Sequence, residues 1–251
     1  MSGRVAVVLG GTSGLGKAIS LGLAAHGADV IPAGRRPDAV ACVCSHIRQM
    51  GRRTLETTVD VTDRETIAAV RDQLLQQMGR LDILVNAAGI TFRKPTVEIS
   101  NTEWSGLFST NLDGVLYACQ VFYEPLKASG AGRVINIASL GSFVAFQEVA
   151  AYCASKAAVL SLTRNLAVEW ARDKICVNAI APGVFPTELN SKLLNGTERG
   201  REILLRTPMN RFGQPDEIVG AAVLLASDGA SFITGHCIAV DGGFLASGVN
   251  S

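Results

Sequence analysis

A tyrosine and a lysine stand four residues apart in the stretch AYCASKAAV, which runs from Ala151 to Val159. Residues at positions i and i+4 of a helix share one face, with Cβ atoms about 5–6 Å apart. A free phenol has a pKa of about 10, too high for a base at neutral pH, and a nearby cation favours the phenolate. The pair Tyr152 and Lys156 therefore predicts acid/base chemistry on a hydroxyl proton, with the lysine lowering the pKa of the phenol.

A serine is placed to assist this pair. Ser139 ends the apolar run GRVINIAS, 13 residues before Tyr152. A hydroxyl at the carboxyl end of a strand can hydrogen-bond a substrate oxygen and hold it beside the phenol. Taken alone, a tyrosine near a lysine is more often a half-exposed aromatic ring beside a solvated charge. The glycine loop described next favours the catalytic interpretation.

The stretch LGGTSGLGKA carries glycines at positions 10, 11, 14 and 16, between an expected strand and an expected helix. Glycines let the backbone turn tightly and approach a pyrophosphate, and the helix N-terminus supplies free N–H groups and partial positive charge. A plain turn needs one glycine, not four in seven residues. The loop therefore predicts a dinucleotide site. Hydride transfer between an alcohol carbon and a nicotinamide would need a partner for the hydroxyl proton, a role that Tyr152 suits.

The elements that must position these residues alternate along the chain. Apolar runs predict strands at 4–10, 28–34, 53–61, 81–89, 132–139, 174–182 and 236–243, and helical spacing predicts helices at 14–27, 38–50, 63–79, 100–130, 149–173 and 214–228. Continuous rather than alternating apolar runs are typical of strands covered on both faces. We expect a single-domain α/β Rossmann fold over residues 1–251, with a doubly wound parallel sheet of about seven strands and helices on both faces. Ser100 and Glu103 have the spacing of a capping box.

Composition narrows the function classes. The 251 residues carry 23 basic and 22 acidic side chains, a net charge of +1, which gives no reason to expect nucleic acid or an anionic membrane as partner. Apolar runs fall short of the roughly 18 residues that span a bilayer. The six cysteines form no C-x-x-C pair and lie at no zinc spacing from a histidine. We expect a cytoplasmic protein with unpaired thiols and no metal site.

The chain resembles the short-chain dehydrogenase/reductase family over essentially its whole length. That family's loop is T-G-x-x-x-G-x-G, and Leu9 stands where it usually has threonine. The stretches DVTD, VNAAG, STNLDG and APGVFPT and the Y-x-x-x-K pair also match the family, in the same order. The resemblance implies Ser139, Tyr152, Lys156 and Asn111 as catalytic residues. In it Lys156 also contacts the nicotinamide ribose, and Asn111 holds a water in a proton relay to Lys156.

The resemblance also implies a set of cofactor-binding residues. They are Gly10, Thr12, Ser13, Gly14, Leu15, Gly16, Asp60, Val61, Asn86, Ala87, Ala88, Gly89, Tyr152, Lys156, Pro182, Gly183, Val184 and Thr187. Two of the family positions have structural alternatives: Asn111 as a polar residue that distorts its helix, and Thr187 as the N-cap of the next segment.

Cofactor choice is suggested by the end of the second strand. An NAD-selective site typically has a carboxylate there, which accepts a hydrogen bond from the ribose 2′-hydroxyl. The stretch ADVIPAGRR puts Gly34 at that position, followed by Arg35 and Arg36, and the first carboxylate is Asp38. A 2′-phosphate would meet no repulsion and would gain a guanidinium partner. We therefore expect NADP to be preferred, with NAD possible; the alternative is that both arginines are solvated charges leading a helix.

These features predict an oxidoreductase that interconverts a secondary alcohol and a ketone. A non-catalytic dinucleotide-binding protein on the same fold is disfavoured, because Tyr152, Lys156, Ser139 and Asn111 are all kept. Among enzymes, the alternative is a reductase of 3-oxoacyl groups on acyl carrier protein, which shares these motifs.

The substrate is the least determined feature. Arg93 and Lys94 follow the expected fourth strand, at the ligand edge of such a sheet. The polar segment 187–206 follows the nicotinamide motif and by resemblance covers the substrate. The pattern around Arg93 resembles the gluconate 5-dehydrogenase and sugar dehydrogenase branch. We expect a sugar acid or polyol that contacts Arg93, Ser139 and Tyr152, with Arg93 as a carboxylate anchor; the alternative is that Arg93 and Lys94 are surface charges.

The C-terminal segment bears on assembly. Family members are commonly tetramers built through their long fourth and fifth helices and their C-terminal segment. Phe244, Leu245 and Val249 follow the last expected strand, where a monomer would have little core left to cover them. We expect a homotetramer.

Overall fold

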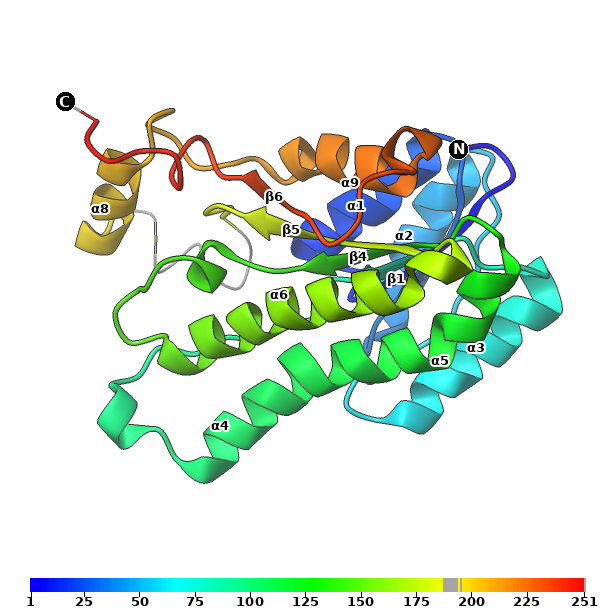
Figure 1. Cartoon of the computed structure of the whole chain (residues 1–251), viewed down its shortest axis with the longest axis horizontal. Helices are drawn as coiled ribbons and strands as arrows, with labels where there is room; N and C mark the ends of the chain where they lie inside the picture. Colours follow the sequence, from blue (N-terminus) through cyan, green and yellow to red (C-terminus); the bar gives the residue numbers. More distant parts are fainter. Residues whose placement is uncertain (187–193, 195, 251) are drawn as a thin grey trace.

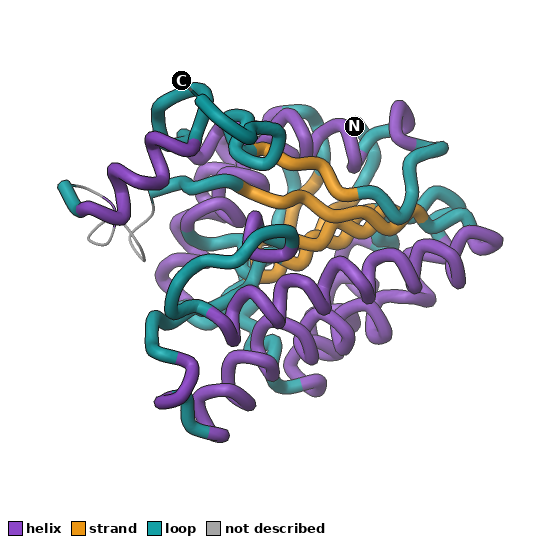
Figure 2. The backbone as a smooth tube through the Cα atoms, turned by 60° about the vertical axis from the view of Figure 1, so that its left-hand side comes forward, coloured by secondary structure: helices purple, strands orange, loops and turns teal. Residues whose placement is uncertain are grey.

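The sheet is parallel throughout and lies between two layers of helices. The structure, a computed structural model, describes residues 1–186, 194 and 196–250. Within these residues the strands are β1 (Val5–Leu9), β2 (Asp29–Ala33), β3 (Ile83–Asn86), β4 (Arg133–Ile137), β5 (Cys176–Pro182) and β6 (Cys237–Val240), in the order β2-β1-β3-β4-β5-β6. Figure 2 shows them as one twisted layer with helices on either side. The expected single-domain Rossmann architecture is confirmed.

In the described part of the chain, most helices lie on one or the other face of the sheet. They are α1 (Gly14–Ala25), α2 (Pro37–Gln49), α3 (Arg64–Met78), α4 (Asn101–Phe108), α5 (Gly114–Ala128), α6 (Ala150–Trp170), α8 (Glu198–Arg206) and α9 (Val219–Ala226). Figure 1 shows α4, α5 and α6 on one side of the sheet and α1 and α9 on the other.

Strand β1 illustrates how the sequence builds both layers. Val5, Val7 and Leu9 pack with side chains of α3, α5 and α6, whereas Ala6 and Val8 pack with those of α1, α2 and α9. Successive side chains of a strand point to opposite faces, so an uninterrupted apolar strand feeds two cores at once.

The order of the strands creates a switch point beside β1. The chain runs from β1 to β2 on one side and then returns to place β3 on the other. The loops that leave β1 and β3 diverge there, at the carboxyl edge where open α/β sheets bind ligands. A Cβ added to Gly10 would lie 2.6 Å from the Ala88 backbone nitrogen, so the two loops touch.

The sheet has six strands where the sequence predicted about seven. The expected strand 53–61 runs beside β2 but pairs with it only through a bridge between Gly34 and Thr58. The Val30 amide donates to Arg53 O at 3.1 Å, and alternate residues of β2 direct their backbone N–H groups to this same edge. One of these is Pro32, which has no N–H to donate, and the ladder is interrupted there.

The expected helix 100–130 is continuous, but its hydrogen-bonding pattern changes from α to π and back in the middle. A capping box between Ser100 and Glu103 opens α4, as predicted, and a π-helical turn at Ser109–Asp113 joins α4 to α5. Such turns are rare and occur frequently at functional sites. This one carries Asn111, which is fully buried.

Shorter elements complete the fold. Single 3-10 turns lie at Thr96–Glu98, Leu140–Ser142, Ala171–Asp173, Pro215–Ile218 and Asp228–Ala230. In the described part of the chain no helix has the length and apolar character that crossing a membrane requires. The same residues hold no group of three or more His, Cys, Asp or Glu side chains that could bind a metal ion.

The C-terminal segment is covered better than the sequence suggested. Phe244 is 4% exposed, because its ring lies 5.9 Å from that of Phe146 and the Arg206 guanidinium sits 4.9 Å from its centroid. The expectation that a monomer leaves Phe244 uncovered was therefore wrong. Val249 is 82% exposed, as expected.

Candidate active site

Helix α6 and the turn after β4 bring the catalytic candidates together. Ser139 caps the turn Leu140–Ser142 by accepting a hydrogen bond from the Gly141 amide at 3.1 Å. A Cβ at Gly141 would lie 2.7 Å from Cys153 Sγ, so this turn packs directly on α6. The Ser139 side chain consequently reaches Tyr152 and hydrogen-bonds it. The serine and the phenol can therefore contact one substrate oxygen.

Lys156 lies on the same face of α6 but is deeply buried. Its side chain is 4% exposed, its Nζ donates to Ile137 O at 2.7 Å, and this atom is 5.9 Å from the centroid of the Tyr152 ring. Burial lowers the pKa of Lys156 to about 8. The Lys156 ammonium is thus held by the backbone carbonyl of Ile137, the last residue of β4.

The protonation of Tyr152 differs from the sequence expectation. Burial raises the pKa of the phenol above its ordinary value, and the hydrogen bond with Ser139 opposes that effect only in part. The lysine is directed at Ile137 O, so the desolvation of the ring prevails. In the protein alone Tyr152 is therefore a neutral phenol, suited to donate a proton.

Asn111 ties the site together from the π-turn. Its Oδ1 accepts from the Ile90 amide at 2.8 Å, and its Nδ2 donates to Ile90 O at 2.9 Å and to Ser155 Oγ at 3.1 Å. Ser155 Oγ in turn donates to Tyr152 O at 2.8 Å. The side chain thus fixes the loop after β3 against α6. The sequence reasoning missed Ser155, although its place next to Lys156 was a usable signal.

The loop after β3 passes close to the lysine. A Cβ at Gly89 would lie 3.4 Å from both Asn111 Oδ1 and Lys156 Nζ. Ala87 and Ala88 are half-buried beside it, and the Ala87 amide donates to Leu9 O at 2.9 Å. The side chain of Asn86 points into the core, where its Nδ2 donates to Asn136 Oδ1 at 2.8 Å. Asn86 therefore supports the strand end from inside.

The glycine loop fits a dinucleotide. Gly10 and Gly14 have φ of 80° and 50°, in the left-handed region. A Cβ at Gly16 would lie 2.1 Å from Gly10 O, so only glycine allows this close turn. Ser13 makes no side-chain cap at the start of α1, and Ser13 and Gly14 are exposed. The helix N-terminus is thus open to an anion.

The rest of this loop is explained by packing. Leu9, in place of the family threonine, is 1% exposed and belongs to the core, while Leu15 and Thr12 are half-buried. A Cβ at Gly34 would lie 2.7 Å from Thr12 Oγ1, so the end of β2 also packs against the loop.

Arg35 and Asp60 lie near each other at the end of β2. Hydrogen bonds from the backbone and hydroxyl of Thr62 hold the pKa of Asp60 below its ordinary value, and the positive charge of Arg35 acts in the same direction. Arg35 and Arg36 are exposed, and Val61 is buried against Gly114. The arginines are therefore accessible to a ligand at this edge.

The nicotinamide-side motif follows β5. Pro182 ends the strand, and the Gly183 amide donates to Val240 O at 2.8 Å. Val184 is half-buried. Thr187 and part of the segment 187–206 lie outside the described residues.

The cations predicted to face the substrate are already engaged. Arg93 Nε lies 2.6 Å from Glu148 Oε2. Lys94 Nζ lies 2.9 Å from both carboxylate oxygens of Glu103. The hydrogen bond from the Ser100 amide, together with this contact and the Ser100 hydroxyl, lowers the pKa of Glu103 to about 2. Lys94 thus stabilises the α4 capping box. The sequence reasoning also missed Glu148, which is distant in sequence from Arg93.

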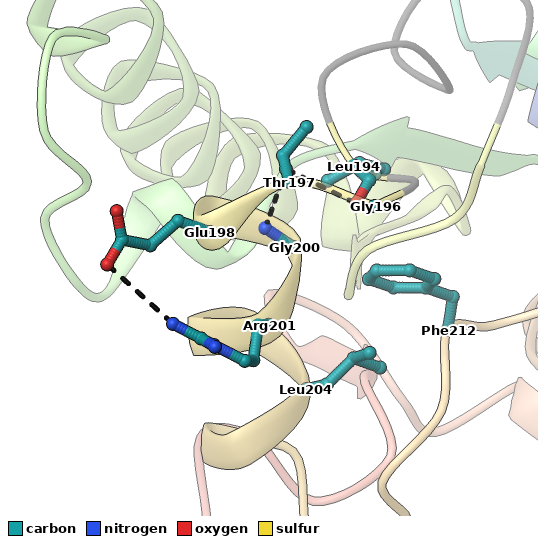
Figure 3. Close-up of a pocket in the computed structure, with 8 residues that line it drawn as sticks. All are labelled: Leu194, Gly196, Thr197, Glu198, Gly200, Arg201, Leu204 and Phe212. Carbon is teal, nitrogen blue, oxygen red and sulfur yellow. Dashed lines mark hydrogen bonds and ion pairs between the residues drawn. The ribbon is translucent and has the colours of Figure 1, made fainter.

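Two cavities lie at the same end of the molecule. One of about 650 Å³ is bounded by α8; Figure 3 shows Leu204 and Phe212 lining it and the Glu198–Arg201 ion pair on the helix. Another of about 400 Å³ borders Gly183 and Val184. Tyr152 lines neither, so geometry and chemistry rather than cavity size identify the site.

Comparison with known proteins agrees with this geometry. A family model described as "Enoyl-(Acyl carrier protein) reductase" matches residues 10–245. The chain belongs to the short-chain dehydrogenase/reductase family. The match covers the glycine loop, the π-turn, Ser139, Tyr152 and Lys156, and it extends past β6.

Two relatives of this short-chain dehydrogenase/reductase are named as dehydrogenases of a sugar acid and of glycerol. It is 39% identical to 2-dehydro-3-deoxy-D-gluconate 5-dehydrogenase of Dickeya dadantii, over 98% of this chain and 97% of the relative. It is 38% identical to NAD-dependent glycerol dehydrogenase of Listeria innocua, over 96% and 93% of the two chains.

A solved structure extends the comparison. Gluconate 5-dehydrogenase from Burkholderia cenocepacia, in complex with NADP and tartrate, is 36% identical with a TM-score of 0.94, over 99% of this chain and 97% of that one. This short-chain dehydrogenase/reductase is accordingly an oxidoreductase of the CH–OH group that uses a nicotinamide cofactor.

Proposed function

We propose that this enzyme interconverts a secondary alcohol and a ketone on a polyol or sugar acid, with NADP(H) as the preferred cofactor. The observation that carries the proposal is the convergence of Ser139, Tyr152 and Lys156 beside a loop that fits a dinucleotide. The cofactor supplies the hydride acceptor or donor when bound.

The chain's own residues supply the proton and the orientation. Tyr152 donates its proton to the ketone oxygen, or takes one from the alcohol in the reverse direction. Ser139 holds that oxygen next to the phenol, since its hydroxyl already contacts Tyr152. Lys156, a cation on the same helix face, compensates the charge that develops on the phenol. Asn111 positions the loop that passes Lys156.

The proposed substrate class rests on the named relatives and on the exposed cation Arg93. The relatives named above act on a sugar acid and on glycerol. The Arg93 side chain, in the loop after β3, is 42% exposed and is the proposed contact for the substrate end remote from the reacting carbon. A ketoreductase of 3-oxoacyl groups shares the catalytic residues and is the alternative.

A substrate panel tests this assignment. Initial rates with polyols, sugar acids, their keto forms and a 3-oxoacyl thioester, each with NADP(H) and NAD(H), should show the highest kcat/KM for a polyol or sugar acid. A higher kcat/KM for the 3-oxoacyl thioester would replace the proposal by its alternative.

Arg35 is expected to provide the preference for NADP. Arg35→Ala should lower kcat/KM for NADP about tenfold or more and leave that for NAD nearly unchanged, because a charge-assisted contact to the 2′-phosphate contributes roughly 1.5–3 kcal/mol. Steady-state kinetics with both cofactors measures this. Arg172→Ala, a change at an exposed arginine after α6, is the control. Equal losses for NADP and NAD would contradict the assignment.

We also propose a cytoplasmic homotetramer. Val168 on α6 is 79% exposed, Phe232 before β6 is 102% exposed, and Trp104 on α4 is 41% exposed. These apolar side chains lie on or near the helices and terminal segment through which the family assembles. The free thiols of the six cysteines suit a reducing compartment. Light scattering at micromolar concentration should give four times the chain mass; a monomer would contradict the assembly.

A further inference from the structure

Glu148 has an unusual backbone conformation beside the catalytic helix. Its φ is 64°, in the left-handed region that residues other than glycine and asparagine rarely adopt. Strain of this kind is costly and gathers at functional sites, where surrounding contacts hold it. Glu148 stands four residues before Tyr152 and just ahead of the first residue of α6.

Contacts from distant segments fix this conformation. The Lys94 amide donates to Glu148 O at 2.8 Å, and Arg199 Nη1 donates to Gln147 O at 3.2 Å. The loop before α6 is thereby joined to the loop after β3 and to α8. The Glu148 side chain, 28% exposed, meets Arg93 Nε at 2.6 Å. The backbone at Gln147 and Glu148 is thus held by two segments, while the Glu148 carboxylate itself is held by Arg93.

This arrangement balances the charge of Arg93. Glu148 neutralises the guanidinium, and Lys94 is bound to Glu103. A substrate carboxylate approaching Arg93 would have to displace Glu148 or lie against it, and like charges at contact distance repel. A hydroxyl meets no such penalty, because the guanidinium donates and the carboxylate accepts.

We propose that Glu148 is a specificity-determining residue. Together with Arg93 it presents a donor and an acceptor side by side, which suits two adjacent hydroxyls of an uncharged polyol and disfavours a carboxylate at that position. This inference rests on the proposed function and narrows its substrate class from polyol or sugar acid to polyol.

Matched pairs of substrates test the inference. D-threitol with D-threonate, and D-glucitol with D-gluconate, differ only in whether the end of the chain is a hydroxyl or a carboxylate. The wild-type enzyme should show a kcat/KM at least about tenfold higher for the polyol of the pair it accepts. Glu148→Gln should lower kcat/KM for the polyol about tenfold and raise that for the acid, because Arg93 then lacks its counter-charge.

Two further variants keep the test independent of folding. Glu148→Gly also removes the carboxylate but relieves the positive φ, so it should fold at least as well and shift the ratio in the same direction. Glu98→Gln, a change at an exposed carboxylate in the loop after β3, should leave the ratio unchanged. Binding of NADPH, followed by its fluorescence, should be the same in all of these proteins.

The outcomes separate this inference from the proposed function. A ratio of polyol to acid kcat/KM that stays the same in Glu148→Gln and Glu148→Gly overturns the inference alone. A wild-type preference for the acid of a matched pair also overturns it. If no polyol, sugar acid or keto form reacts while NADPH still binds, the proposed function fails and the inference falls with it.

Discussion

Replacement of Tyr152 by phenylalanine is expected to lower kcat by a factor on the order of 10³, while the Kd for NADPH stays within about twofold of wild type. The ring keeps its place on α6 and only the hydroxyl is lost. That hydroxyl is the group that Ser139 contacts and that can exchange a proton with the substrate oxygen. Stopped-flow turnover and fluorescence titration measure the two quantities.

Tyr117→Phe is a matched control for this variant. Tyr117 is a half-buried tyrosine of α5 whose ring lies 5.9 Å from the Arg64 guanidinium. Loss of its hydroxyl should leave both kcat and the Kd unchanged. Turnover in Tyr152→Phe equal to that of Tyr117→Phe would exclude Tyr152 as the proton donor.

Lys156→Met should damage both turnover and cofactor affinity. The substitution keeps an unbranched side chain of similar length but removes the cation near the phenol, so we expect kcat to fall about 10²-fold or more. By family resemblance the lysine also touches the nicotinamide ribose, so the Kd for NADPH should rise about tenfold. If Lys156→Met bound NADPH normally but had a reduced kcat, the proposed contact of Lys156 with the nicotinamide ribose would be wrong. Its role in acid/base chemistry would still stand.

The same substitution should change how stability depends on pH. Burial lowers the folded-state pKa of Lys156 to about 8, whereas in the unfolded chain it is about 10.4. Between these values the unfolded chain binds more protons, so the free energy of unfolding rises with pH. From pH 7 to pH 9.5 the lysine should add about 2 kcal/mol to it.

Urea unfolding of the cofactor-free protein tests this expectation. The wild-type midpoint should increase relative to that of Lys156→Met between pH 7 and pH 9.5. Lys174→Met, a change at an exposed lysine, should follow the wild-type curve. Parallel curves for wild type and Lys156→Met would mean that the lysine is not held as a buried cation.

Local patterns predicted the parts of the site that depend on local geometry. The spacing of Tyr152 and Lys156 on a helix, the glycine loop and the Ser100–Glu103 capping box each follow from a few adjacent residues, and the structure has all three. By contrast, the sequence favoured a strand at 53–61, but Pro32 on the facing edge of β2 interrupts the hydrogen bonds that this strand would need.

Features that depend on contacts between distant segments could not be predicted in this way. Arg93 was predicted to anchor a substrate carboxylate, but Glu148 reaches it from a loop 55 residues away. Burial of Tyr152, which raises its pKa, and the hydrogen bond of Lys156 to Ile137 O depend on how α6 packs on β4. The spacing of residues in the sequence predicts which side chains share a helix face, but it does not predict how strongly packing removes them from water.

The most direct test of the account is the titration of Tyr152 itself. The ultraviolet difference spectrum between wild type and Tyr152→Phe reports phenolate at this one position, with and without NADP⁺. In the free protein the pKa of Tyr152 should lie above 10, because burial disfavours the phenolate. The nicotinamide ring of NADP⁺ would bring a positive charge into this site when bound, so the pKa of Tyr152 should fall and should match the value that governs kcat for alcohol oxidation. A pKa that NADP⁺ leaves unchanged, or a pH profile of kcat that does not follow it, would contradict the role of Tyr152 as the catalytic acid and base.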